Sequence, residues 1–238
     1  MGDKINLALI GAGHWGKNLA RVFHELGILK TICESSEEIL FKKGAKYPEI
    51  TTTSSFAEVL DCPDINVIAI ATSAEQHYSM AKASLLADKH VFVEKPLSMT
   101  AQEGESLVQI AKQQGKVLFV GHILQYHPAI QTVKRMLQKG ELGKLQYIYS
   151  NRLNLGKIRR EENILWSFAP HDISVILSLV GEEPVEISAT GTNILHPEIA
   201  DTTITNMKFS SGIGAHIFVS WLHPFKEQKM VIIGDRKM

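Results

Sequence analysis

Short apolar runs alternate with amphipathic stretches through the first half of the chain. Each run has the length and uniform hydrophobicity of a strand buried on both faces. The stretch after the first run is typical, because its apolar residues fall on one helical face and Gly27 is placed to end the helix. Strands alternating with helices predict a doubly wound parallel sheet, which is an α/β fold. The runs expected to form strands are 5–10, 29–34, 67–72, 91–93 and 117–120.

The pattern changes after Gly121, where longer β-rich segments replace the short apolar runs. One helix is expected to start at Pro128, and another is expected over about 169–179. Ser210-Ser211-Gly212 reads as a hairpin turn. We therefore expect a Rossmann domain over 1–121 and an α+β domain with a mainly antiparallel open sheet over 122–238. The β-rich segments of the second half are 145–151, 184–193, 202–209, 213–221 and 229–233.

Composition excludes several classes of function. The 25 basic and 25 acidic residues balance, so nothing favours nucleic acid or an anionic membrane as a partner. No apolar run approaches the length of a membrane span, and the first residues lack a signal-peptide pattern. Cys33 and Cys62 make neither a disulfide framework nor a metal set, and His122 and His127 lack metal-site spacing. A cytoplasmic protein without a metal is expected.

A glycine-rich segment follows the first expected strand and precedes the first expected helix. In Gly11-Ala12-Gly13-His14-Trp15-Gly16, the first glycine makes the tight turn and the second lets the backbone approach a pyrophosphate. The third glycine allows close packing of helix on strand, and the helix N-terminus offers N–H groups to phosphates. Glu34, eighteen residues after Gly16, is placed to accept hydrogen bonds from a ribose and to repel a 2′-phosphate. The pattern predicts NAD, although Glu34 also suits the start of the next helix.

Two further strand ends carry polar residues. Thr72, Ser73 and His77 follow one strand, and Glu94-Lys95-Pro96 follows the next. Ligands of open α/β sheets bind beyond the carboxyl ends of the strands, so these residues are candidates for contacts with the cofactor. On spacing alone, a lysine at a strand end is more often a surface lysine than a catalytic one.

Together, these motifs resemble the glucose–fructose oxidoreductase / inositol dehydrogenase / MocA-like family over essentially the whole chain. The resemblance implies NAD as the cofactor and Lys95 as a catalytic residue where nicotinamide meets substrate. It also implies a catalytic role for His171, beside Asp172. The family usually has an aspartate four residues before this histidine, and here that position is Ser167.

The segments 151–156 and 166–174 resemble a narrower group, the dehydrogenases that act on UDP-N-acetylglucosaminuronic acid in bacterial polysaccharide synthesis. A basic cluster before the second expected helix is either a clamp for a diphosphate or a sugar carboxylate, or a solvated charged loop. The ring of Trp166 would either pack against a sugar or fill the core. The candidates for substrate contacts are Lys95, Arg152, Asn154, Lys157, Arg159, Arg160, Asn163, Trp166 and His171.

The expected reaction is oxidation of a secondary hydroxyl of a nucleotide sugar, at C3, with hydride passing to NAD. Lys95 or His171 would act as the base, and the other would position the hydroxyl. The alternatives are a dehydrogenase of a free sugar or an inositol, and an NAD-binding regulator with little activity. The resemblance also implies a homo-oligomer, a dimer or tetramer. The last residues, 232–238, resemble an interior segment of the family, so a shortened second domain is expected.

Overall fold

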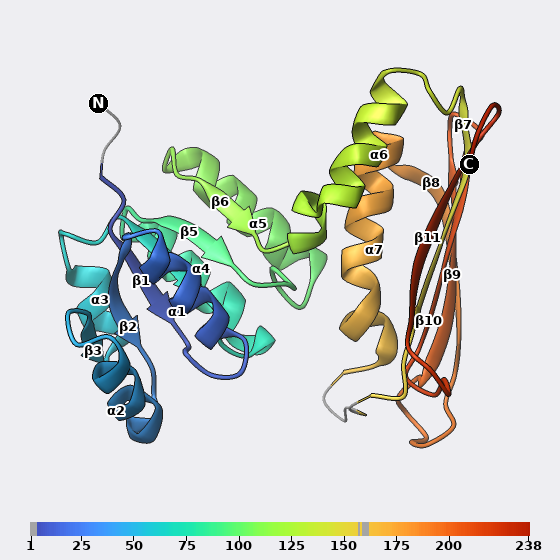
Figure 1. The fold of residues 1–238 in the computed structure, drawn as a ribbon. Helices are drawn as coiled ribbons and strands as arrows, with labels where there is room; N and C mark the ends of the chain where they lie inside the picture. Colours follow the sequence, from blue (N-terminus) through green and yellow to red (C-terminus); the bar gives the residue numbers. More distant parts are fainter. Residues whose placement is uncertain (1–3, 157, 159–161) are drawn as a thin grey trace. The chain divides into compact units, whose positions relative to one another are not determined.

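The computed structural model describes residues 4–156, 158 and 162–238. The chain forms two compact units, Met1–Gly121 and His122–Met238, coloured blue to green and green to red in Figure 1.

Unit 1 is a six-stranded parallel sheet in the order β3-β2-β1-β4-β5-β6. The order reverses between β1 and β4, which is the switch point where ligands bind in doubly wound folds. The doubly wound sheet expected from the alternating pattern is confirmed. The strands are β1 (Leu7–Ile10), β2 (Leu29–Cys33), β3 (Thr51–Thr53), β4 (Val67–Ile70), β5 (His90–Val93) and β6 (Leu118–Val120). The helices are α1 (Gly16–Glu25), α2 (Glu37–Lys46), α3 (Phe56–Asp61), α4 (Ala74–Leu86) and α5 (Ala101–Gln113).

The uniform apolar runs of unit 1 are buried as strands flanked by helices. All four residues of β1 are buried, and their side chains divide between two clusters. Ala8 and Ile10 belong to one cluster, and Leu7 and Leu9 belong to the other. Such burial on both faces is the reason that the sequence shows runs rather than alternation.

Local capping explains where several helices of unit 1 begin. The hydroxyl of Ser55 accepts a hydrogen bond from the N–H of Glu58, and Thr100 does the same for Glu103. In both cases the hydroxyl residue stands three positions before a glutamate, which is the spacing of a capping box. Ser73 has the same spacing, but its side chain makes no capping hydrogen bond to α4.

Unit 2 is a five-stranded sheet in the order β11-β7-β10-β9-β8. Three of its neighbouring pairs are antiparallel and one, β7 with β10, is parallel. The sheet is therefore mainly antiparallel, as expected, and α7 lies along one face of it (Figure 1). The strands are β7 (Leu145–Leu153), β8 (Pro184–Thr192), β9 (Thr202–Phe209), β10 (Gly214–Ser220) and β11 (Glu227–Gly234). The helices are η1 (Ile123–Tyr126), α6 (Pro128–Gln138) and α7 (Ile164–Val180).

The long helix α7 begins earlier than the sequence suggested. The prediction placed its start near Ala169. Asn163 starts the helix instead, since its side chain accepts a hydrogen bond from the N–H of Trp166. His171 consequently lies within α7 and not at its start. In the described part of the chain, no helix is long and apolar enough to span a membrane.

A buried carboxylate joins three segments of unit 2. Asp201 is 1% exposed and accepts hydrogen bonds from the N–H groups of Ile194 and Leu195, both at 2.7 Å. Its other oxygen accepts from the indole of Trp221 at 2.5 Å. The neighbouring carbonyl of Ala200 accepts the N–H of Ile164, so this loop also holds the start of α7.

Candidate functional site

The glycine-rich loop between β1 and α1 is shaped by close contacts that only glycine permits. Gly11 has φ +86°, and a Cβ at Gly16 would lie 2.0 Å from the carbonyl oxygen of Gly11. At Gly13, by contrast, a Cβ would meet nothing within 4 Å. The loop is thus tight on its inner side and open at its middle glycine, which is the form that fits a pyrophosphate beside a helix N-terminus.

Glu34 lies directly against this loop. One of its carboxylate oxygens accepts the N–H of Ala12 at 2.8 Å, and the other accepts the N–H of Ser36 at 3.2 Å. The acid therefore stands at the end of β2, beside the phosphate-binding turn, where a ribose acceptor is needed. It also precedes Ser36, which caps α2, and a contact between Glu34 and a ribose stays a prediction.

Glu94 connects the glycine-rich loop to the end of β5. The indole Nε1 of Trp15 donates to a carboxylate oxygen of Glu94 at 2.7 Å, and Glu94 is buried. A Cβ at Gly121 would lie 3.1 Å from both oxygens, so the glycine there makes room for the carboxylate. Burial raises the pKa of Glu94 above its usual value, against the opposing effects of the Trp15 hydrogen bond and the charges of Lys95 and His77.

His77 ties together the segments that follow β4 and β5. Its ring is 2% exposed, with Nδ1 2.6 Å from the carbonyl oxygen of Pro96 and Nε2 3.2 Å from that of Thr72. Carbonyl oxygens only accept, so the ring supports these segments as a donor. Direct contact between His77 and a cofactor stays a prediction.

Unit 1 therefore gathers most of the predicted cofactor residues beyond the carboxyl ends of β1, β2, β4 and β5. Lys95 comes directly after Glu94, whose N–H donates to Ile70 and whose side chain is fixed by Trp15. The backbone at Lys95 is therefore held in place by the contacts of Glu94. A cis peptide bond joins Lys95 to Pro96.

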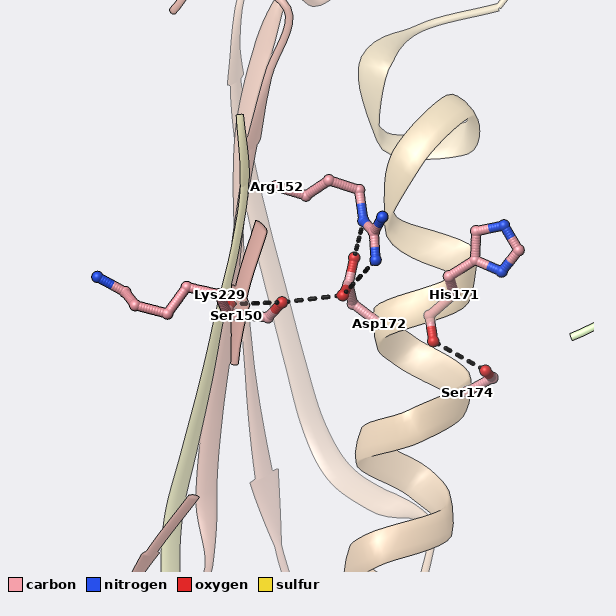
Figure 2. Close-up of polar contacts among 6 residues, drawn as sticks. All are labelled: Ser150, Arg152, His171, Asp172, Ser174 and Lys229. Carbon is pink, nitrogen blue, oxygen red and sulfur yellow. Dashed lines mark hydrogen bonds and ion pairs between the residues drawn. The ribbon is translucent and has the colours of Figure 1, made fainter. Parts of the chain in front are cut away.

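In unit 2, His171 and Asp172 project from α7 in different directions. Asp172 points to the sheet and receives both Arg152 and Ser150 from β7, whereas the ring of His171 points away from the sheet (Figure 2). No sequence pattern pairs Arg152 with Asp172, because they lie twenty residues apart on different elements.

The contact between His171 and His122 was also not predicted from the sequence. The ring of His122, which precedes η1, lies edge-on to that of His171, with centroids 6.4 Å apart. The amide of Gln125 in η1 donates to the carbonyl of Ser174 in α7 at 2.5 Å. No periodicity links η1 to α7, so only the folded unit reveals this packing.

The remaining substrate candidates have mixed positions. The side chain of Asn163 caps α7, and the ring of Trp166 is 42% exposed rather than part of the core. Asn154 is half-buried beside Gly156, and its N–H donates to Ser220. Ser167, where the family's aspartate is expected, is buried. Lys157, Arg159 and Arg160 lie outside the described residues. Among the described residues, no three histidine, cysteine or acidic side chains could hold a metal ion together.

The sheet order, the glycine-rich loop and Glu34 define unit 1 as a Rossmann domain that binds NAD. Residues 5–122 match the family model "Oxidoreductase family, NAD-binding Rossmann fold", and residues 130–238 match "GFO/IDH/MocA C-terminal domain". The chain belongs to this Gfo/Idh/MocA oxidoreductase family. The family, the fold class and the cofactor predicted from the sequence are thus confirmed.

Individual relatives place the chain within a varied family. It is 32% identical over 196 residues to the uncharacterized oxidoreductase YdgJ of Escherichia coli, covering 76% of this chain and 55% of YdgJ. It is 25% identical over 218 residues to a UDP-N-acetylglucosamine 3-dehydrogenase of Acidithiobacillus ferrooxidans, covering 89% of this chain and 66% of that protein. The chain thus spans less than two thirds of the length of these two relatives.

Solved structures share the fold. GenD2 from gentamicin A biosynthesis, in complex with NAD, superposes with a TM-score of 0.90 at 19% identity, covering 99% of this chain and 71% of GenD2. A structure of UDP-N-acetylglucosamine 3-dehydrogenase from Acidithiobacillus ferrooxidans gives a TM-score of 0.88 at 25% identity, covering 97% of this chain and 74% of that one.

Proposed function

We propose that this chain oxidises a secondary hydroxyl, at C3, of a nucleotide sugar such as UDP-N-acetylglucosaminuronic acid, for the synthesis of a bacterial surface polysaccharide. The observation that carries the proposal is the likeness, over 89% of the chain, to a protein named UDP-N-acetylglucosamine 3-dehydrogenase. The resemblance of segments 151–156 and 166–174 to dehydrogenases of the corresponding uronic acid supports the same class of substrate.

The residues of unit 1 fit the cofactor. Gly11, Gly13 and the N–H groups at the start of α1 would hold the pyrophosphate, and Glu34 would accept hydrogen bonds from the adenosine ribose. Thr72, Ser73 and the segment from Glu94 to Pro96 would line the nicotinamide end. When bound, NAD supplies the acceptor for the hydride that leaves the sugar carbon.

The protein must remove the hydroxyl proton while the hydride leaves. Lys95 and His171 carry this task in the proposal, one as general base and the other as a hydrogen-bond partner of the same hydroxyl. Ser167 cannot supply the negative charge that an aspartate would bring near this pair. The chemistry therefore rests on an amine and an imidazole, without the carboxylate found in most of the family.

A panel assay tests the proposed substrate class. The whole chain is incubated with NAD and UDP-N-acetylglucosaminuronic acid, UDP-N-acetylglucosamine, levoglucosan or myo-inositol, and NADH absorbance is followed. We expect the highest kcat/KM with the uronic acid. NADH formation only with an unactivated sugar or inositol would exclude a nucleotide sugar as the substrate.

A free sugar is the second candidate substrate. A levoglucosan dehydrogenase of Pseudarthrobacter phenanthrenivorans is 26% identical to this chain over 203 residues, which cover 76% of the chain and 52% of that enzyme. A third candidate, an NAD-binding regulator, is suggested by Ser167 in place of the aspartate. Tight NAD binding without turnover of any panel member would favour it.

Self-association as a dimer or tetramer is proposed through the sheet face of unit 2 opposite α7. The ring of Tyr149 stacks on His216 with centroids 5.3 Å apart, and the hydroxyl of Tyr147 lies 2.8 Å from Nδ1 of the same histidine. A rigid aromatic surface of this kind suits an interface. Sedimentation velocity of the whole chain tests this, and a monomer at every concentration would contradict it.

A further inference from the structure

The helix α7 is unusually apolar for one that carries a candidate catalytic residue. Of its seventeen residues, His171 and Asp172 are the only ionisable ones. Its buried residues include Ile164, Ala169 and Ile176, which belong to the hydrophobic core of unit 2 and pack through non-directional contacts. Such contacts favour burial of an apolar face but define the rotation of the helix about its axis only loosely.

The side chain of Asp172 adds directional hydrogen bonds between α7 and β7. Arg152 Nε donates to Asp172 Oδ2 at 2.7 Å, and Arg152 Nη2 donates to Asp172 Oδ1 at 3.0 Å. The hydroxyl of Ser150, two residues earlier on β7, also donates to Asp172 Oδ1 at 2.9 Å. The Asp172 side chain is 4% exposed and that of Arg152 is 15% exposed, so water screens this pair little.

A buried ion pair such as Arg152 with Asp172 is expected to contribute little to the stability of the fold. Removing two charges from water is costly, and apolar residues of similar volume often stabilise a fold equally well. A planar guanidinium bound to a carboxylate at two points does, however, impose a direction that apolar packing lacks. The pair is therefore better suited to orienting α7 than to strengthening its attachment.

The need for orientation is greatest at this point of α7. Pro170 lies inside the helix and has no N–H to donate to the carbonyl of Trp166, so the helix is weakened just before His171. After it, the hydroxyl of Ser174 donates to the carbonyl of His171 at 2.8 Å. Asp172 directly follows His171, and its side chain anchors this part of α7 to β7.

We propose that Arg152 and Asp172 are positioning residues that fix the rotation of α7 and so hold the His171 ring away from the sheet. Successive helical residues point about 100° apart, so anchoring Asp172 to β7 determines where its neighbour points. Figure 2 shows this division, with Asp172 on the sheet side of α7 and His171 on the other. Arg152, which the sequence makes a candidate for substrate contact, donates two hydrogen bonds to Asp172 within the protein. The inference rests on the proposed function, in which His171 touches the substrate.

The first test needs no turnover. Histidine ring signals of the whole chain are recorded by NMR with isotope-labelled histidine, and His171 is assigned with a His171→Gln variant. We expect one His171 signal in the parent chain. In the double variant Arg152→Met, Asp172→Leu, we expect that signal to split or broaden while the midpoint of thermal unfolding stays within about 5 °C.

Two further variants control this measurement. Lys208→Met, Glu186→Leu removes an exposed ion pair of the same sheet and should leave the His171 signal unchanged. If the first double variant does not fold, Arg152→Lys keeps the charge and loses the two-point geometry, and it should broaden the signal in the same way. A single, unshifted His171 signal in a folded Arg152 variant would overturn the proposal.

Turnover separates this inference from the proposed function. With a substrate that the parent chain oxidises, Arg152→Lys should lower kcat by about a hundredfold and change KM little. A misplaced reacting group slows the chemical step more than it weakens substrate binding. A His171 signal that responds in a chain without activity on any sugar supports positioning and contradicts the proposed function. An active Arg152→Lys chain with unchanged kcat contradicts positioning alone.

Discussion

Replacing Lys95 with alanine is expected to lower kcat by about 10²- to 10⁴-fold, which is the usual contribution of a general acid or base. The dissociation constant for NAD should change by less than about threefold, because the glycine-rich loop and Glu34 carry the fixed contacts. Stopped-flow NADH formation gives the first quantity, and titration calorimetry with NAD gives the second.

An exposed lysine of the same unit supplies the control for this experiment. Lys112, in the last turn of α5, lies far along the chain from any strand end that carries the predicted site. Lys112→Ala should leave both kcat and NAD binding unchanged. Normal turnover by the Lys95→Ala chain would remove Lys95 from the chemistry.

Replacing Asp201 with alanine is expected to destabilise unit 2 by about 3 kcal/mol or more. The substitution leaves two backbone N–H groups and the indole of Trp221 without their acceptor, in a fully buried position. Urea unfolding followed by tryptophan fluorescence measures the loss, because Trp221 is completely buried. Glu198→Ala, in the same loop but exposed, should have an effect within about 0.5 kcal/mol.

The contribution of Asp201 should depend on pH. Burial alone would raise the pKa of Asp201, but the hydrogen bonds from Leu195, Trp221 and Ile194 outweigh it and hold the pKa below its usual value. A carboxyl whose pKa is lower in the folded state stabilises the fold above its unfolded pKa, about 3.9. The stability gap between the parent chain and Asp201→Asn should therefore be full above about pH 5 and narrow as the pH falls toward the folded pKa. A gap that widens toward low pH would contradict this assignment.

The elements that could be predicted from the sequence are those whose signals are local. Apolar runs identified β1, β2, β4 and β5. The β-rich segment 202–209 forms β9, in which Thr203, Thr205 and Met207 are buried and Ile204, Asn206 and Lys208 are exposed. In each case, the pattern arises within one element, so no knowledge of its neighbours is needed.

Features that depend on partners distant in sequence were missed. The late placement of the start of α7 is a different case, because the side chain of Asn163 caps this helix through a contact that is local in sequence. The parallel pairing of β7 with β10 depends on strand order, which periodicity cannot reveal. The ion pair of Arg152 with Asp172 likewise exists only once α7 lies on β7.

The glycine-rich loop shows the opposite case, since its geometry follows from the order of three glycines between a strand and a helix. The carboxylate of Glu34 lies against this loop, at the place that the spacing indicated. The hydrogen bond from the indole of Trp15 to Glu94 is a further contact, which the glycine motif does not predict. The sequence thus accounted for the glycine-rich loop of unit 1 more fully than for the side-chain contacts of α7 in unit 2.

The most direct test of the proposed reaction uses UDP-N-acetylglucosaminuronic acid carrying deuterium at C3. The whole chain is incubated with this substrate and NAD, and the reduced cofactor is analysed by mass spectrometry. If hydride leaves from C3, the deuterium is found in the reduced nicotinamide and the sugar product has lost it. Reduced cofactor without deuterium would show that another carbon is oxidised, and no reduced cofactor at all would contradict the dehydrogenase activity itself.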